Sequence, residues 1–293
     1  MNYIPAKTLL TRTKDSSWFG TDYTMNIYKG CCHGCIYCDS RSDCYGVDNF
    51  DTVRAKENSS IILQRELRHK IKTGVIFTGS MSDPYNPFEK KYELTRNALS
   101  LMNNYGFGVA IATKSSLICR DIDILQRIKE HSPLICKISI TTFDNSLSSQ
   151  IEQNVNPSSE RFKAIDKLSQ AGIYSGILLM PILPFINDNK ENIINIVHKA
   201  KECGAKFIFP AFGVTLRNNQ RDYFFKKLDE SFPNIKFKYI NHYKNSYACG
   251  SPNANNLYYS FKNECEKLGI LYKMNDIISD YKSKYVPKQI SLF

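Results

Sequence analysis

The chain has 293 residues, of which 42% are hydrophobic, and its 39 Lys and Arg against 28 Asp and Glu give a formal net charge of +11. This hydrophobic share excludes a disordered chain, because it can bury enough apolar surface to offset chain entropy. The length allows one large α/β barrel or two modest domains, and it excludes a small disulfide-held protein. The sequence shows neither a membrane span nor a signal peptide, so we expect a cytoplasmic protein.

Short β-branched runs alternate with amphipathic segments as far as about residue 215. The expected strands are 24–28, 74–78, 106–113, 134–142, 173–183 and 205–212. Between them apolar residues recur at helical spacing, as at Ile193, Val197 and Ala200. Six strands that each precede a helix predict a parallel sheet covered by helices, either open or closed into a partial barrel. Catalytic chemistry is then expected at the carboxyl ends of the strands.

Helix-capping residues support this scheme. Ser158 or Ser159 is expected to cap one helix, and Asp188 or Asn189 another. Beyond residue 215 the alternation weakens, although helical patterns return at 221–232 and 256–268. We therefore divide the chain into a barrel (1–215), a C-terminal extension packed on it (216–288) and a terminal peptide (289–293).

Four of the ten cysteines lie within eight residues, in the stretch Gly30-Cys31-Cys32-His33-Gly34-Cys35-Ile36-Tyr37-Cys38 after the first expected strand. Clustered thiolates on a glycine-containing loop can bind one soft metal centre, usually an iron–sulfur cluster or zinc. Two ligand sets fit: C-x3-C-x2-C with Cys31, Cys35 and Cys38, or C-x2-C-x2-C with Cys32, Cys35 and Cys38. A zinc site would need a further ligand, for which Cys44, His33 and Cys249 are the candidates.

The first ligand set resembles the signature of the radical SAM superfamily, C-x3-C-x-aromatic-C, with Tyr37 at the aromatic position. The resemblance implies a partial (β/α)6 TIM-type barrel with a C-terminal extension. It also implies a four-iron four-sulfur (4Fe-4S) cluster on Cys31, Cys35 and Cys38, with S-adenosylmethionine on the fourth iron. In that family one electron from the cluster cleaves this cofactor to a 5′-deoxyadenosyl radical, which takes a hydrogen atom from substrate. A low-potential electron donor, such as a flavodoxin or ferredoxin, is implied as a partner.

The resemblance extends from about residue 20 to 215 and is most specific to the DNA-repair-photolyase-like branch that includes spore photoproduct lyase. The further matching elements are Thr78–Tyr85 with Pro87 and Glu89, Thr113–Ser115, Arg120–Asp123, Ser139–Thr141, Pro157 with Arg161, Ala171–Ile173, and Pro181–Pro184 with Asn187 and Asp188. This branch implies an enzyme that repairs a damaged pyrimidine in DNA. Two alternatives stay open, namely a radical SAM enzyme that modifies RNA or protein, and a non-catalytic, metal-stabilised nucleic-acid-binding protein.

The candidate cofactor-binding residues are Tyr37, Gly79, Ser80, Ser82, Lys114, Ser139 and Thr141. Gly79 lets the backbone approach a ligand closely, and the resemblance places Ser80 and Ser82 beside the methionine part of the cofactor. Lys114 can offer charge to a carboxylate or phosphate, and the two hydroxyl residues of the fourth strand share one face. Tight turns, a solvated lysine and satisfied buried hydroxyls are the structural alternatives.

One departure from the branch concerns the hydrogen donor. In spore photoproduct lyase a cysteine just before the Ser-Asp pair of the second-strand segment is thought to return a hydrogen atom to the product radical. Here Ser80-Met81 occupies that place, and an O–H bond is too strong for a good donor to carbon. We expect Cys119, Cys136 or a tyrosine to act instead, if a donor is needed.

The last five residues, Gln289-Ile290-Ser291-Leu292-Phe293, resemble the bacterial sliding-clamp-binding pentapeptide, whose Leu-Phe pair fills an apolar pocket. We therefore expect Gln289, Leu292 and Phe293 to bind a sliding clamp, and a tail docked on the protein's own core is the alternative. Lys and Tyr also interleave over residues 236–285, which favours contact with DNA. A solubilising surface would give the same charge.

Overall fold

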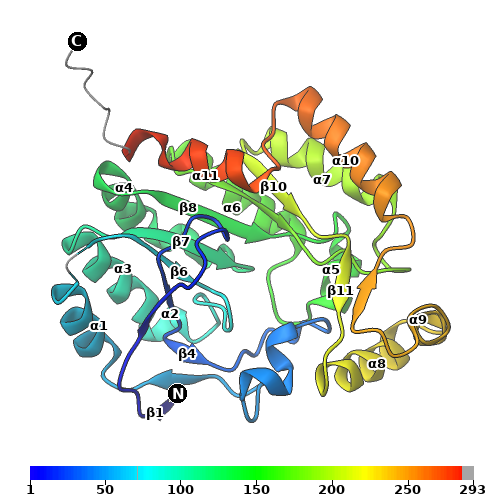
Figure 1. Cartoon of the computed structure of the whole chain (residues 1–293), viewed down its shortest axis with the longest axis horizontal. Helices are drawn as coiled ribbons and strands as arrows, with labels where there is room; N and C mark the ends of the chain where they lie inside the picture. The colour runs from blue at the N-terminus through cyan, green and yellow to red at the C-terminus, as the bar shows by residue number, and fades with distance from the viewer. Residues whose placement is uncertain (71, 286–293) are drawn as a thin grey trace.

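A seven-stranded sheet forms the centre of the structure, a computed structural model that describes residues 1–70 and 72–285 (Figure 1). Six neighbouring strands are parallel, in the order β3 (Tyr23–Met25), β6 (Val75–Thr78), β7 (Gly108–Thr113), β8 (Leu134–Ser139), β9 (Ser175–Leu179) and β10 (Phe207–Pro210). β2 (Leu10–Arg12) pairs with β3 in the antiparallel direction at one edge. The expected partial (β/α)6 barrel is confirmed. Most strands are shorter than their apolar runs, because the loops beyond them, such as that at Ile182, are also buried.

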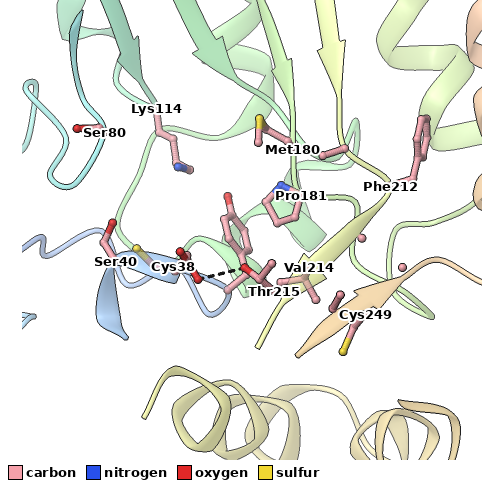
Figure 2. Close-up of a pocket in the computed structure, with 16 residues that line it drawn as sticks. Cys38, Ser40, Ser80, Lys114, Met180, Pro181, Phe212, Val214, Thr215 and Cys249 are labelled. Carbon is pink, nitrogen blue, oxygen red and sulfur yellow. Dashed lines mark hydrogen bonds between the residues drawn. The ribbon is translucent and has the colours of Figure 1, made fainter. Parts of the chain in front are cut away.

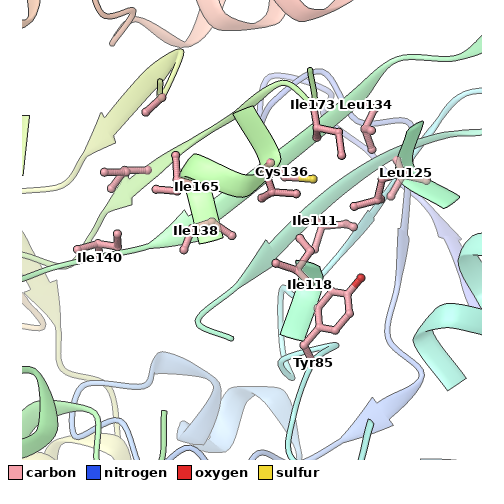
Figure 3. Packing of buried hydrophobic residues seen from close by; sticks show 14 of the residues in the cluster. Tyr85, Ile111, Ile118, Leu125, Leu134, Cys136, Ile138, Ile140, Ile165 and Ile173 are labelled. Atoms are coloured by element: carbon pink, nitrogen blue, oxygen red, sulfur yellow. The ribbon is translucent and has the colours of Figure 1, made fainter. Parts of the chain in front are cut away.

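Helices that follow the strands cover the outer face of the sheet (Figure 1). They are α1 (Ser59–Arg68), α3 (Leu94–Asn104), α4 (Ile122–His131), α6 (Ser158–Gln170) and α7 (Lys190–Glu202), with the short α2 (Glu89–Tyr92), α5 (Asn145–Ile151) and η3 (Ser116–Asp121) between them. Alternation along β8 separates two cores, because successive side chains point to opposite faces. Cys136 and Ile138 pack toward the helices, as Figure 3 shows, whereas Ile135 packs inside the barrel.

One of the two predicted helix caps is present in the structure, and the other is not. The Asn189 side chain caps α7 by accepting from the backbone N–H of Asn192 at 2.9 Å, as expected. Neither Ser158 nor Ser159 caps α6, because Pro157 occupies the N-cap position. The Ser159 N–H donates instead to the side chain of Asn145, at 3.0 Å, so a residue outside the helix satisfies this end.

The amino-terminal ends of the strands are closed by a plug of aromatic residues and by α11 (Met274–Lys282). The hydroxyl of Tyr281 on α11 donates to the carbonyl of Phe19 at 2.7 Å, and both side chains belong to the core inside the barrel. Lys137 lies in the same core with Nζ 4.3 Å from the Phe19 ring centroid and 3.8 Å from that of Phe77. Burial lowers the pKa of Lys137 to about 7. Among the described residues, this closure leaves the opposite end of the barrel, toward β4 in Figure 1, as the open one.

Two small sheets flank this open end. One contains β1 (Asn2–Ile4), β5 (Arg54–Lys56) and β4 (Tyr28–Lys29), and the other pairs β11 (Gly213–Thr215) with β12 (Ala248–Gly250). The chain between β11 and β12 forms α8 (Gln220–Ser231) and α9 (Ile235–Tyr243), after which α10 (Ala254–Leu268) packs on α7. The short turns are η1 (Asp39–Arg41), η2 (Asp43–Tyr45) and η4 (Ser283–Tyr285). Within the part of the chain described, no helix has the length and apolar character needed to cross a bilayer.

Candidate active site at the carboxyl ends of the strands

The cysteine-rich loop connects β4 to η1 and is fixed from both sides. The backbone N–H of Cys31 donates to the carbonyl of Phe50 at 2.8 Å, and that of Ile36 donates to Ile151 at 3.0 Å. Gly30 has a φ of +79°, and a Cβ there would collide with backbone carbonyls. Glycine is therefore required where the loop begins.

The loop turns three of its four thiols toward one cavity of about 290 Å³, which Cys31, Cys35 and Cys38 line together. Cys32 does not line it and faces a separate groove on the outside of the loop. The structure therefore separates the two ligand sets that the spacing left open, and it favours C-x3-C-x2-C. Within the described residues, no three His, Cys, Asp or Glu side chains converge tightly enough to hold a single metal ion. The thiols surround a space instead.

The three thiols need positive charge close by if they are to ionise. Burial raises the pKa of Cys31 to about 12 and also raises the pKa values of Cys35 and Cys38. The thiolate is the form that binds metal. Lys114 at the end of β7 lines the same cavity, and its positive charge opposes the rise in the pKa values of Cys35 and Cys38. A cationic metal centre among these thiols would lower their pKa values further and so favour the thiolate form.

A buried ion pair holds the loop from behind. Arg161 donates through Nη2 to Glu152 at 2.5 Å, and neither side chain is exposed to solvent. The hydroxyl of Tyr37 donates to the other oxygen of Glu152, and the backbone of Glu152 bridges to that of Cys35. Burial alone would raise the pKa of Glu152, but the charges of Arg161 and Lys114 outweigh it and hold the pKa below its usual value. Glu152 is therefore an anion that fixes the aromatic residue of the motif.

A second carboxylate organises the other wall of the cavity. Asp83 accepts from the hydroxyl of Thr113 at 2.6 Å and from the backbone N–H of Lys114 at 2.8 Å. The Nδ1 atom of His33 lies 3.5 Å from the same carboxylate. Burial lowers the pKa of His33 against the opposing effect of Asp83. Asp83 therefore ties the cysteine loop to the ends of β6 and β7.

Most of the residues predicted to bind cofactor lie at the cavity. Gly79, Ser80, Ser82, Lys114 and Ser139 line it. Gly79 has a φ of +99°, and a Cβ there would run into the carbonyl of Ala112, so only glycine fits. The hydroxyl of Ser82 donates to the carbonyl of Gly30 at 2.6 Å and so positions the cysteine loop. Ser80 is more exposed, with its hydroxyl 3.4 Å from the Asn26 side chain.

Thr141 does not join this group. Strand β8 ends at Ser139, so the alternation that predicts a shared face for the two residues stops before Thr141. Thr141 is fully buried and its carbonyl accepts from the side chains of Asn187 and Asn192. Its place is the loop after β8, outside the lining of the cavity.

Neither expected hydrogen donor lies at the cavity, which corrects that prediction. Cys136 is fully buried on the face of β8 that packs against the helices, opposite the face that carries Ser139 (Figure 3). Cys119 lies on η3, where its thiol points to the carbonyl of Ala164 at 3.8 Å. Both side chains contact the outer core and neither lines the cavity, so we do not retain them as hydrogen donors.

A second cavity of about 530 Å³ adjoins the first (Figure 2). The residues that line both cavities are Cys38, Ser40, Ser80, Lys114 and Met180. The far wall comes from β11 and β12 and is built from small residues, including Gly213, Ala248 and Gly250. This wall was not predicted from the sequence, because the two strands are separated by two helices and each is only three residues long.

The rim of the second cavity is polar and aromatic. Asp39 accepts from the hydroxyls of Thr215 at 3.1 Å and Tyr45 at 2.7 Å, and from Nε of Arg217 at 3.1 Å. The Arg217 guanidinium lies 5.1 Å from the ring centroid of Tyr247, a tyrosine that is 51% exposed. An extended ligand that enters the cavity would therefore pass a cation and two accessible tyrosine rings.

Comparison with known proteins identifies the family. The model of the radical SAM superfamily matches residues 25–197, which is more than half of the chain. The chain belongs to the radical SAM superfamily. Radical SAM enzymes bind a 4Fe-4S cluster and S-adenosylmethionine, and three thiols around a cavity with a cation beside them fit this pair of cofactors.

The relatives of this radical SAM enzyme include proteins of bacteria and archaea. An uncharacterised protein of Mycobacterium tuberculosis, Rv2578c, is 26% identical over 248 residues, which cover 82% of this chain and 73% of that protein. An uncharacterised protein of Methanocaldococcus jannaschii, MJ0683, is 33% identical over 172 residues, covering 58% of this chain and 63% of the relative. A structure of spore photoproduct lyase complexed with dinucleoside spore photoproduct aligns with a TM-score of 0.67 and 14% identity, over 92% of this chain and 80% of that one. The two proteins share the fold.

Proposed function

We propose that this radical SAM enzyme acts on DNA and repairs a damaged pyrimidine. The observation that carries the proposal is the second cavity, which adjoins the cysteine-lined cavity and is large enough for a nucleobase or a linked pair of bases. The spore photoproduct lyase structure of the same fold is complexed with a dinucleoside lesion, which supports a substrate of this class. The net charge of +11 adds attraction for a polyanion.

In this proposal Cys31, Cys35 and Cys38 would hold the 4Fe-4S cluster, and Gly79 and Ser80 would contact S-adenosylmethionine. When bound, these cofactors supply a radical that removes a hydrogen atom from a substrate carbon. The protein's own residues position the reactants. Ser82 and the Tyr37–Glu152 contact keep the cysteine loop in place.

The substrate side of the site is suited to a flat apolar group. Met180, Pro181 and Phe212 contribute apolar surface, and the small residues of β11 and β12 leave the space between them open (Figure 2). Outside this cavity, Arg217 is placed to contact a phosphate, and Tyr247 offers a face for stacking on a neighbouring base. A base turned out of its strand could enter while the backbone stays at the rim.

Lys114 is the residue for which we expect the clearest effect on cofactor affinity. Burial would lower its pKa, but Cys35, Glu152 and Asp83 outweigh burial and raise it, so the side chain stays charged at neutral pH. We expect Lys114→Met to weaken S-adenosylmethionine binding by about 10- to 100-fold, the effect of losing one hydrogen bond to a charged group. Equilibrium binding to the cluster-loaded protein measures this. Lys201→Met, on the outer helix α7, serves as the control, and equal affinities for the two variants would contradict the role of Lys114.

The substrate proposal is tested with UV-irradiated oligonucleotides under anaerobic conditions, with dithionite as reductant. We expect consumption of a pyrimidine photoproduct together with formation of 5′-deoxyadenosine, both measured by mass spectrometry. Ala248→Trp fills the second cavity and leaves the first unchanged, so it should still cleave S-adenosylmethionine but lose at least about 10-fold in photoproduct conversion. Cofactor cleavage with no change in any DNA lesion would instead point to RNA or protein as substrate.

The sliding-clamp prediction concerns Gln289, Leu292 and Phe293, which lie outside the described residues. It stays a prediction from the sequence. Clamp binding would bring the enzyme to DNA, so it fits the proposed substrate without being needed for the chemistry.

A further inference from the structure

The outer side of the cysteine loop carries a groove of about 370 Å³ that shares no lining residue with either cavity. We call it the loop groove. Its lining includes Cys32, Gly34, Asn154, Tyr223, Lys226 and Lys227. Of the four cysteines in the loop, Cys32 is the one that lines this groove and is not placed among the ligands.

The loop groove lies very close to the expected iron–sulfur cluster. Cys32 is bonded through one peptide to Cys31, and Gly34 through one peptide to Cys35, and both of these ligands line the cavity on the other side of the loop. The side chain of Asn154 donates to the carbonyl of Cys32 at 2.9 Å, which fixes the loop backbone at the groove floor. The groove and the cavity therefore lie against neighbouring residues of the same loop.

Other routes to the cluster are obstructed. S-adenosylmethionine and substrate would fill the two cavities at the open end of the barrel. The opposite end is closed by Phe19 and by Tyr281 of α11. Electron transfer weakens steeply with distance, so the loop groove offers a donor the short approach that leaves both ligands in place.

The charges around the loop groove favour an acidic partner. Lys226 is exposed and, among the described residues, has no ion-pair partner, while Lys227 pairs with Glu230 at 2.7 Å. The acidic group of the lining, Asp51, is neutralised by a bidentate contact with Arg41. The Arg41 guanidinium in turn lies 3.6 Å from the Tyr223 ring centroid, which holds the Arg41–Asp51 pair in place and leaves Lys226 as the exposed charge of the lining. Opposite charges on two partners accelerate their encounter.

We propose that the loop groove is the docking site for the electron donor, a small acidic protein that carries a flavin or an iron–sulfur centre. The inference rests on the proposed function in one respect, namely that Cys31, Cys35 and Cys38 hold the cluster. The donor is oxidised by one electron and the cluster is reduced by one, and no bond forms or breaks in the transfer. Such redox encounters need only a small interface.

The test compares reduction of the cluster-loaded enzyme by reduced flavodoxin and by dithionite, each followed by stopped-flow absorbance. For Lys226→Glu/Lys227→Glu we expect reduction by flavodoxin to slow at least about 10-fold at low salt, with the difference shrinking at high salt because the charges are screened. Reduction by dithionite should stay within about twofold. The single variant Lys226→Glu removes an exposed charge that has no ion-pair partner in the described part of the chain, and so guards against a folding defect. Lys201→Glu on α7 repeats the charge change on a different helix. The affinity of flavodoxin for each variant, measured by titration, gives a readout independent of activity.

Equal rates of reduction by flavodoxin for the wild type and both groove variants would overturn the proposal. A loss of DNA affinity in the variants with unchanged reduction would also overturn it, since the lysines would then contact phosphates. Failure of the proposed function has a different signature. The wild type would convert no DNA lesion with dithionite, while the rates of cluster reduction would still report on docking.

Discussion

Cys35→Ala is expected to lose the iron–sulfur cluster and to reduce S-adenosylmethionine cleavage to the background of the assay. Cys35 is buried, lines the cofactor cavity with Cys31 and Cys38, and is bridged through its backbone to Glu152. A 4Fe-4S cluster that leaves one iron open for a substrate ligand has only three protein thiolates. Without Cys35 only two thiolates remain, and two thiolates cannot hold the cluster. Iron and sulfide content and 5′-deoxyadenosine yield, measured after anaerobic reconstitution, test this.

Two neighbouring cysteines make the experiment decisive. Cys32→Ala should keep its iron, because Cys32 faces the loop groove and not the cavity. Cys44→Ala, in the exposed turn η2, should keep both iron and activity. If Cys32→Ala lost its cluster and Cys31→Ala kept it, the ligand set would be C-x2-C-x2-C and the arrangement derived above would be wrong.

Glu152→Gln is expected to destabilise the protein by about 3 kcal/mol, because it leaves the buried Arg161 charge without its counter-ion. At roughly 2 °C or more per kcal/mol, the melting temperature should fall by about 6 °C or more. The single amide oxygen of glutamine can accept from Tyr37 or from Arg161 but not from both, so the cysteine loop should also loosen and iron occupancy after reconstitution should fall. Urea unfolding and calorimetry of the cluster-free protein measure the stability, and iron analysis measures the occupancy.

The control residue lies on α6, the helix that also carries Arg161. Glu160→Gln breaks an ion pair with Lys163 in which both side chains are well exposed, so a change within about 0.5 kcal/mol is expected. Equal effects of the two substitutions would mean that Glu152 is not a buried counter-ion.

The effect of Glu152 should also depend on pH. Its pKa in the folded protein is held below the usual value, so it contributes stability above the unfolded pKa of about 4.3 and loses it as pH falls through the folded pKa. The difference in unfolding free energy between the wild type and Glu152→Gln should therefore be fully developed near neutral pH and shrink below about pH 4. A difference that is constant down to acid pH would contradict the ionised state.

Much of the barrel could be predicted from local pattern. Apolar β-branched runs identified the six parallel strands, and Asn189 was correctly placed as a helix cap. These features depend on interactions between residues close in the chain, which a sequence displays directly. The capping of α6 depends instead on a contact from Asn145, thirteen residues before the helix, and the prediction from Ser158 or Ser159 was wrong.

Within the site, the cysteine spacing indicated an iron–sulfur or zinc centre, and the resemblance to the radical SAM superfamily favoured the first, but neither predicted the geometry. The cysteine motif and Gly79 indicated a cluster and a close backbone approach, since both requirements are local. The direction in which a side chain points was harder to predict from the sequence. Cys136 was a plausible donor by residue type, but strand alternation turns it toward the helices, and Thr141 falls beyond the strand end that would have brought it to the cavity.

The sequence by itself determined the family, the cysteine-rich loop and the positions of the strands along the chain, because motifs and periodicity are properties of short segments. Only the tertiary structure decided which of the adjacent Cys31 and Cys32 faces the cavity, and which distant group holds Tyr37. Glu152 lies 115 residues from Tyr37, and β12 pairs with β11 across two intervening helices. Such contacts depend on how the whole chain packs. A buried charge is stable only where a counter-ion lies beside it, and a short strand only where another strand pairs with it.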